Sequence, residues 1–264
     1  MLQSMHTPTN SSTLHLFSNP EKASLYVAQQ IADLIRQQQT QGKPAVLGLA
    51  TGNTPKRVYE ELINLHKNEG LSFANVISFN LDEYYPIHPE DTQSYTYFMN
   101  RYLFGSIDIK LENIHIPHTN CAANGINEYC KAYEEKIARF GGLDLQLLGI
   151  GRNGHIGFNE PGSSFQDTTR LVNLHSLTRE DAQTDFGGLE NVPHQAISIG
   201  IDTIVQARKI LLLALGEKKS EIISKALQGE ITTRVPASIL QNLPHVEYVL
   251  DHEAAALIEE AVVA

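Results

Sequence analysis

Basic residues are scarce in this 264-residue sequence. It carries 20 Lys and Arg against 30 Asp and Glu, a formal net charge of −10 at pH 7. The deficit argues against general binding of nucleic acids, because that binding depends on Lys and Arg side chains that neutralise phosphates. An anionic small molecule is still compatible with the sequence if cations and backbone N–H groups are placed locally.

Cysteines are also few, and long apolar runs and the pattern of a secretory leader are not found. No run approaches the roughly 18 apolar residues that a membrane span needs, and the polar start of the chain has no charged-then-apolar pattern. Cys121 and Cys130 have no CxxC or Cys/His spacing, which predicts reduced, structural thiols. We expect a cytoplasmic protein with no membrane partner, in which residues 1–12 form a flexible N-terminal segment.

Apolar runs of strand length alternate with amphipathic helix patterns along the chain. Ala45–Ala50, Val76–Leu81 and Leu143–Ile150 are nearly continuous apolar runs, typical of strands that are covered on both faces of a parallel sheet. Asn19–Glu21 marks a helix start, with a capping Asn and Pro at the first helical position. Together with the chain length, these patterns predict a single α/β domain over residues 1–264, a mostly parallel sheet flanked by helices.

Weaker patterns complete the expected order of elements. Further helices are expected near residues 94–104 and 124–140 and after Ser220, and further strands near residues 168–174, 196–200 and 210–215. A strand at residues 245–250 is expected to close the sheet, with a last helix beginning near Asp251. Residues 178–188 are polar and ambiguous.

The glycine-rich stretch Gly149–Gly162 follows an expected strand and holds His155, Asn153 and Glu160 close together. Ligands of an open α/β sheet bind beyond the carboxyl ends of its strands, so this stretch is placed for a site. His155 suits a proton shuttle because imidazole titrates near neutral pH. Glu160 could orient the ring and favour its charged form, and a purely structural histidine is the alternative.

Asp82 and Glu83 follow another expected strand. Successive side chains point different ways, so one carboxylate is expected to face inward and the other to be structural. An inward carboxylate suits abstraction of a proton next to a carbonyl or imine. A helix cap is the alternative role for it.

Two loops could bind an anion. Residues 51–54 connect a strand to a helix, where backbone N–H groups and the helix dipole favour a phosphate. The loop is neither a Walker motif nor GxGxxG, so a plain turn with Thr54 as the helix cap is the alternative. Lys219 stands at the head of a later helix, where it can reach a bound anion or simply be solvated.

Two other chemistries are less favoured. His155 and Glu160 lack a second nearby His or Cys, so no metal site is expected. No G-x-S-x-G elbow is found, which argues against a Ser-His-Asp hydrolase.

Three segments resemble the glucosamine-6-phosphate deaminase family, in the family's order and spacing. They are Leu49–Pro55, Ser78–Tyr84 and Gly149–Pro161, and the likeness runs from about Leu14 to Leu250. The resemblance implies a single Rossmann-like α/β domain that converts glucosamine 6-phosphate and water to fructose 6-phosphate and ammonia without a cofactor. Such an enzyme would be a hydrolase of amino-sugar metabolism.

The resemblance also implies roles for individual residues. Asp82 matches the base that moves a proton from C2 to C1 through an enolamine, His155 matches the ring-opening acid/base, and Glu160 matches the carboxylate paired with it. The residues that match the loop around the sugar phosphate are Thr51, Gly52, Asn53 and Thr54, and Lys219 matches a phosphate-binding lysine.

Two departures from the family pattern bear on the expected site. Asn153 stands where well-known members have Asp, and its amide can hold the imidazole but brings no charge. Thr184 falls at the position of a phosphate-gripping Arg, so Arg179 or another cation would have to substitute.

A third departure concerns regulation. Ser163 and Arg170 match residues of the allosteric N-acetylglucosamine 6-phosphate site of regulated members, but Val172 replaces a matching Lys. This predicts little or no activation by that ligand.

Three alternatives stay open at this point. Galactosamine 6-phosphate could be the substrate, since the sequence does not show which epimer the loops prefer. A 6-phosphogluconolactonase-like hydrolase would share the fold and the phosphate loops, and a non-enzymatic sugar-phosphate sensor is the third possibility. The sequence leaves the oligomeric state open.

Overall fold

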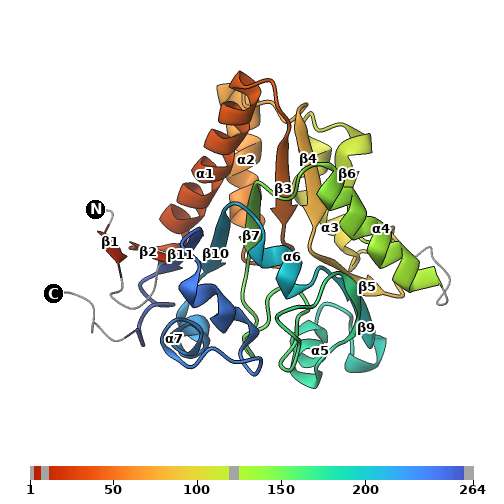
Figure 1. Ribbon diagram of the computed structural model, residues 1–264, viewed down its shortest axis with the longest axis vertical. Coiled ribbons are helices and arrows are strands. Elements are labelled where there is room, and N and C mark those ends of the chain that lie inside the picture. Colours follow the sequence, from red (N-terminus) through yellow and green to blue (C-terminus); the bar gives the residue numbers. More distant parts are fainter. Residues whose placement is uncertain (1–2, 7–11, 119–124, 259–264) are drawn as a thin grey trace.

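The computed structural model describes residues 3–6, 12–118 and 125–258. Among these residues, eight strands form one sheet in the order β1-β2-β11-β10-β7-β3-β4-β6, and three form a second sheet in the order β5-β9-β8 (Figure 1). The large sheet consists of β1 (Gln3–His6), β2 (Thr13–Phe17), β3 (Ala45–Leu49), β4 (Val76–Asn80), β6 (Ile114–His115), β7 (Leu145–Leu148), β10 (Ile210–Ala214) and β11 (Val246–Asp251). The second sheet consists of β5 (Asp82–Tyr85), β8 (Arg170–Asn173) and β9 (Gln195–Ser198).

The large sheet is parallel except for the antiparallel pair β1–β2. Helices cover both of its faces, as the sequence predicts. One face packs against α1 (Pro20–Thr40), α2 (Lys56–Glu69) and α3 (Tyr95–Tyr102), and the other against α4 (Ile126–Arg139), α6 (Ile201–Val205) and α7 (Ser220–Gln228). The remaining helices within the described residues are α5 (Ser176–Ala182) and the 3-10 turns η1 (Phe104–Ser106), η2 (Leu111–Asn113), η4 (Leu189–Asn191), η5 (Glu217–Lys219) and η6 (Pro236–Asn242).

Strand β3 shows why the central strands are continuously apolar. Leu47 and Leu49 belong to the core on the α1 and α2 side, whereas Val46 belongs to the core on the α4 and α7 side. Alternate side chains of a strand point to opposite faces, so a strand between two layers of helices needs apolar residues at every position. The expected start of α1 is also confirmed: the Asn19 side chain accepts from Lys22 N at 2.9 Å, and Pro20 is the first helical residue.

Two expectations about the end of the chain are wrong. Strand β11 does not close the sheet, because it lies between β10 and β2. Residues 252–257 form turns instead of a helix, and the Asp251 carboxylate there accepts from the backbone N–H groups of Gly216 and Ala254. Strand β2 is missed by the sequence analysis because polar Thr13 and His15 interrupt its apolar pattern.

Some expectations fall on undescribed residues or stay untested. Cys121 and the expected helix start at Asn124 lie outside the described residues, whereas Cys130 is buried. The single domain over 1–264 and the flexible segment 1–12 stay predictions, and within that segment Gln3–His6 form β1. Within the described ranges, no helix combines the length and apolar character needed to cross a membrane. The cytoplasmic location stays a prediction.

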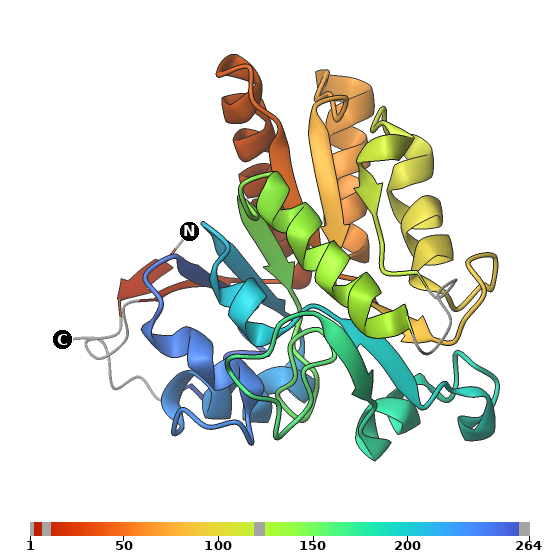
Figure 2. The same cartoon turned by 45° about the vertical axis from the view of Figure 1, so that its right-hand side comes forward.

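The second sheet lies beyond the carboxyl ends of the central strands. In Figures 1 and 2, β3 and β4 point toward the end of the molecule where β5, β9 and α5 gather. Asp82 follows β4, as the sequence predicts, and it is the first residue of β5 in this second sheet, a strand that the sequence analysis did not predict. The ambiguous stretch 178–188 contributes the end of α5 and the turn that follows it.

Candidate active site

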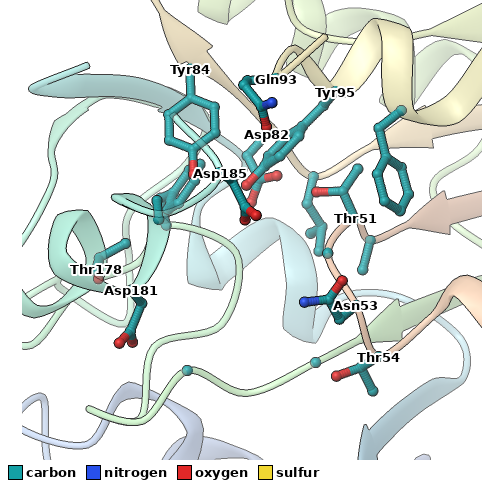
Figure 3. A pocket seen from close by; sticks show the side chains of 18 of the residues that line it. Thr51, Asn53, Thr54, Asp82, Tyr84, Gln93, Tyr95, Thr178, Asp181 and Asp185 are labelled. Atoms are coloured by element: carbon teal, nitrogen blue, oxygen red, sulfur yellow. The ribbon is translucent and has the colours of Figure 1, made fainter. Parts of the chain in front are cut away.

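A cavity of about 510 Å³ opens at the carboxyl ends of the central strands. It brings together segments that follow β3, β4, β7 and β10, and α3 and α5 complete its wall (Figure 3). The predicted site residues that line it are Thr51, Gly52, Asn53, Thr54, Asp82, His155 and Lys219. Asn153 and Glu160 are not part of the lining; they stand behind His155.

The side chains of Asp82 and Glu83 point in different directions, as the alternation along a strand predicts. Asp82 is 6% exposed and lines the cavity. Burial, with a smaller effect of the neighbouring Glu83, raises the pKa of Asp82 to about 8. A carboxyl group with such a pKa is a stronger base, once ionised, than an exposed one.

Glu83 is the structural partner. Its carboxylate accepts from the backbone N–H groups of Tyr95 at 2.9 Å and Thr96 at 3.0 Å, at the start of α3. Burial raises the pKa of Glu83 to about 7, although these hydrogen bonds favour its charged form. Glu83 thus joins β5 to α3 and places a negative charge next to Asp82.

His155 is held by a chain of polar contacts behind the cavity. Its Nδ1 lies 3.3 Å from Glu160 Oε2, and Thr178 Oγ1 lies 3.4 Å from the same nitrogen. Asn153 Nδ2 donates to Glu160 Oε2 at 2.8 Å, and Asn153 Oδ1 accepts from His155 N at 3.2 Å. Burial alone would raise the pKa of Glu160, but the hydrogen bond and charge of His155, helped by Thr178 and Asn153, lower it to about 2. An ionised Glu160 orients the imidazole through Nδ1 and leaves Nε2 for the cavity.

Two glycines let this loop approach the reactive side chains. A Cβ at Gly151 would collide with the imidazole ring of His155. Gly157 has a φ of +57°, and a Cβ there would lie 3.3 Å from Asp82 Oδ2. Glycine avoids the collision at Gly151 and adopts the positive φ at Gly157 without steric cost. The second contact also shows that the loop carrying His155 runs directly beside the Asp82 carboxylate.

The loop of residues 51–54 lies directly before α2, where the sequence predicts it, and its role as an anion cradle stays a prediction. Helix α2 has Pro55 at its N-cap position with no side-chain hydrogen bond, so Thr54 does not cap the helix. Lys219 Nζ donates to Ile150 O at 2.7 Å, and burial lowers the pKa of Lys219. The lysine therefore lies against the start of the His155 loop, on the cavity wall.

Arg179 does not substitute for the cation that the family pattern places at Thr184. Its guanidinium donates to Leu189 O at 2.9 Å and Val192 O at 3.0 Å, and neither Arg179 nor Thr184 lines the cavity. Arg170, from the expected allosteric set, donates to Asn159 at 2.8 Å and lies 2.8 Å from Asp167, also outside the lining.

The sequence analysis missed several lining residues. Tyr84 and Tyr95 pack 5.1 Å apart between ring centroids and face the cavity together with Asp185, as Figure 3 shows. The cations Lys56, Arg101 and Arg152 also line the cavity. The sequence analysis assigned neither tyrosine to the site, and the cations follow no motif.

Comparison with known proteins places this chain in a family. Residues 18–248 match the sequence model of the family described as glucosamine-6-phosphate isomerases/6-phosphogluconolactonase. A Clostridium botulinum (strain Langeland / NCTC 10281 / Type F) protein named glucosamine-6-phosphate deaminase is 50% identical over 215 residues, which cover 81% of this chain and 87% of that protein.

Solved structures agree with this match. The structure of a monomeric glucosamine-6-phosphate deaminase has a TM-score of 0.88 and 41% identity, covering 92% of this chain and 99% of that chain. The 6-phosphogluconolactonase from Trypanosoma brucei has a TM-score of 0.73 at 20% identity, covering 94% and 99%, which shows the shared fold alone. This chain therefore belongs to the glucosamine-6-phosphate isomerase/6-phosphogluconolactonase family.

Proposed function

We propose that this chain is a glucosamine-6-phosphate deaminase, which isomerises an amino-sugar phosphate and releases ammonia. One observation carries the proposal: the buried carboxylate of Asp82 and the imidazole of His155, from separate segments, line one cavity. The two relatives with that name, at 50% and 41% identity, support it.

His155 would open the sugar ring. Its Nε2, on the side of the imidazole away from Glu160, would take the proton of the C1 hydroxyl and return one to the ring oxygen. Glu160 lies 3.3 Å from Nδ1 and would stabilise the imidazolium formed on the way. Asn153 would hold Glu160 in place through its 2.8 Å hydrogen bond.

Asp82 would then move a proton between carbons. As a carboxylate it would take the proton from C2 of the open-chain aldehyde, which leaves an enolamine, and return the proton to C1. The product is the C2 imine of fructose 6-phosphate. Water adds to C2 of this imine, and ammonia leaves. The raised pKa of Asp82, about 8, suits a base that must be strong enough to remove a proton from carbon.

The phosphate would lie at the loop of residues 51–54. This loop precedes the first turn of α2, where backbone N–H groups are available, and Lys219 lines the same cavity. The amino-sugar ring would then extend from this loop toward Asp82 and His155.

Ammonia release from glucosamine 6-phosphate and from galactosamine 6-phosphate, measured side by side with the purified protein, tests the proposal. We expect ammonia and a ketose phosphate in equal amounts from one of the two epimers. No ammonia from either would refute the deaminase function.

A 6-phosphogluconolactonase is the second candidate, because members of that kind share the fold. Lactone hydrolysis needs water activated by His155 and gives no task to the buried Asp82. Hydrolysis of 6-phosphogluconolactone at a rate that Asp82→Asn leaves unchanged, without deamination, would favour it.

A further inference from the structure

Lys56 lies where a cation is unfavourable for its own helix. It is the first residue of α2, whose first turn has no acidic residue, whereas the first turns of α1, α4 and α7 each carry one. The positive end of the helix dipole disfavours a cation there. The next residue, Arg57, has Glu21 at 3.4 Å, while no carboxylate within salt-bridge distance of Lys56 is found in the described part of the chain. A residue that is unfavourable for its own helix and lies on a cavity wall is often retained for function.

Three neighbours hold the Lys56 ammonium group in place. Lys56 Nζ donates to Asn53 Oδ1 at 2.8 Å. The same nitrogen lies over two aromatic rings, 4.8 Å from the centroid of Tyr102 and 5.8 Å from that of Phe98. The face of an aromatic ring attracts a cation. All four residues line the cavity. Helix α3 thereby fixes the ammonium group against the loop of residues 51–54.

The contact decides which way the Asn53 carboxamide faces. An ammonium group has donors and no acceptor, so the amide atom that faces Lys56 has to be the oxygen. The amide nitrogen then points away from Lys56, and in the view of Figure 3 it is directed toward the side of the cavity where Asp181 and Thr178 lie. Asn53 thus presents two N–H donors to whatever the loop binds.

We propose that Lys56 is a positioning residue of the phosphate site, which acts by holding the Asn53 carboxamide with its N–H donors toward the ligand. The ligand class, a sugar phosphate, rests on the proposed function. The arrangement gives a physical account of how this cavity would bind a phosphate although Thr184 occupies the position of the expected Arg. Without Lys56 the amide could turn its oxygen, an acceptor, toward the anion.

Binding measured by calorimetry tests this role without turnover. The probes are inorganic phosphate and glucose 6-phosphate, which has the phosphate but no amino group to lose. Lys56→Met keeps the length of the side chain and removes its donors, and we expect both probes to bind about five- to tenfold more weakly. Lys56→Arg, which can still donate to Asn53, should restore most of the affinity. Lys67→Met is the matched control, because Lys67 is exposed on the same helix and should change neither affinity by more than about twofold.

A double-mutant cycle separates positioning from a plain charge effect. If Lys56 acts through Asn53, Lys56→Met in an Asn53→Ala background should have less than half of its effect in the wild type. In turnover, Lys56→Met should raise KM by the same factor as the binding constant and leave kcat within about twofold.

Three results would overturn the proposal: Lys56→Met that binds both probes like Lys67→Met, an effect undiminished in the Asn53→Ala background, or a wild type that binds neither probe. A wild type that binds glucose 6-phosphate but releases no ammonia would refute the deaminase function alone. In that case the comparison of the Lys56 variants remains valid.

Discussion

The carboxyl group of Asp82 should make activity rise steeply between pH 6 and pH 8. Burial and the neighbouring Glu83 raise its pKa to about 8, and only the ionised form can accept a proton from carbon. About 1% of the molecules would have the carboxylate at pH 6 and about half at pH 8, so kcat/KM should rise about tenfold per pH unit over most of this range. An exposed aspartate would show no such rise, because its titration is complete below pH 6.

Glu83→Gln tests the smaller of the two causes of this shift, the charge of Glu83. The substitution removes the negative charge next to Asp82. It keeps one acceptor oxygen, whereas the carboxylate uses separate oxygens for Tyr95 N and Thr96 N, so one of these two contacts is lost. The pKa of Asp82 should fall, and the acid limb of the kcat/KM profile should move to lower pH. The substrate's own titration is common to both enzymes, so the difference between their profiles reports on Asp82.

Steady-state rates of ammonia release from pH 5 to 9 provide the profile, with the stability of each protein checked over the same range. A wild-type profile that is already flat between pH 5 and pH 7 would refute the reasoning. So would identical profiles for the wild type and Glu83→Gln, since the charge of Glu83 would then have no effect on the base.

Further predictions concern the His155 loop and its surroundings. Gly151→Ala should lower kcat/KM about a hundredfold, because its Cβ collides with the imidazole. Gly125→Ala should have little effect, because Gly125 does not line the cavity and its Cβ would meet no atom within 4 Å; equal rates in the two variants would contradict this. Glu160→Gln should lower the free energy of unfolding at pH 7 by up to about 3 kcal/mol, since the pKa of Glu160 is lowered to about 2. This stabilisation is present above the unfolded pKa and is lost as pH falls toward 2, so denaturation curves of the two proteins that differ equally at pH 7 and pH 2 would disprove it. N-acetylglucosamine 6-phosphate should not activate the enzyme, as Arg170 is engaged by Asn159 and Asp167; a severalfold drop in half-saturation on adding it would show otherwise.

The layered fold follows from the sequence because its central strands are apolar at every position. Ala45–Ala50 and Val76–Leu81 each lie within one residue of the observed strands β3 and β4. Asp82 and His155 could be placed at one edge because parallel strands deliver their carboxyl ends to the same side. The different orientations of the Asp82 and Glu83 side chains followed from the alternation of side chains along a strand.

The features that escaped prediction depend on contacts between distant segments. Strand β2 is held in the sheet by pairing with β11, and His15 within it lies 3.0 Å from Glu247, a partner that its own segment does not reveal. The second sheet pairs β5 with β9, more than a hundred positions later in the chain, and no local pattern announces that pairing. The position of the Lys56 side chain could not be predicted either, since it depends on contacts with the aromatic rings of α3.

The ammonia released from glucosamine 6-phosphate by Asp82→Asn is the most direct measure of the proposed base. The account predicts a fall of about a hundred- to ten-thousandfold in kcat, with glucose 6-phosphate still bound and the circular dichroism spectrum unchanged. A folded Asp82→Asn protein that releases ammonia within tenfold of the wild-type rate would contradict it.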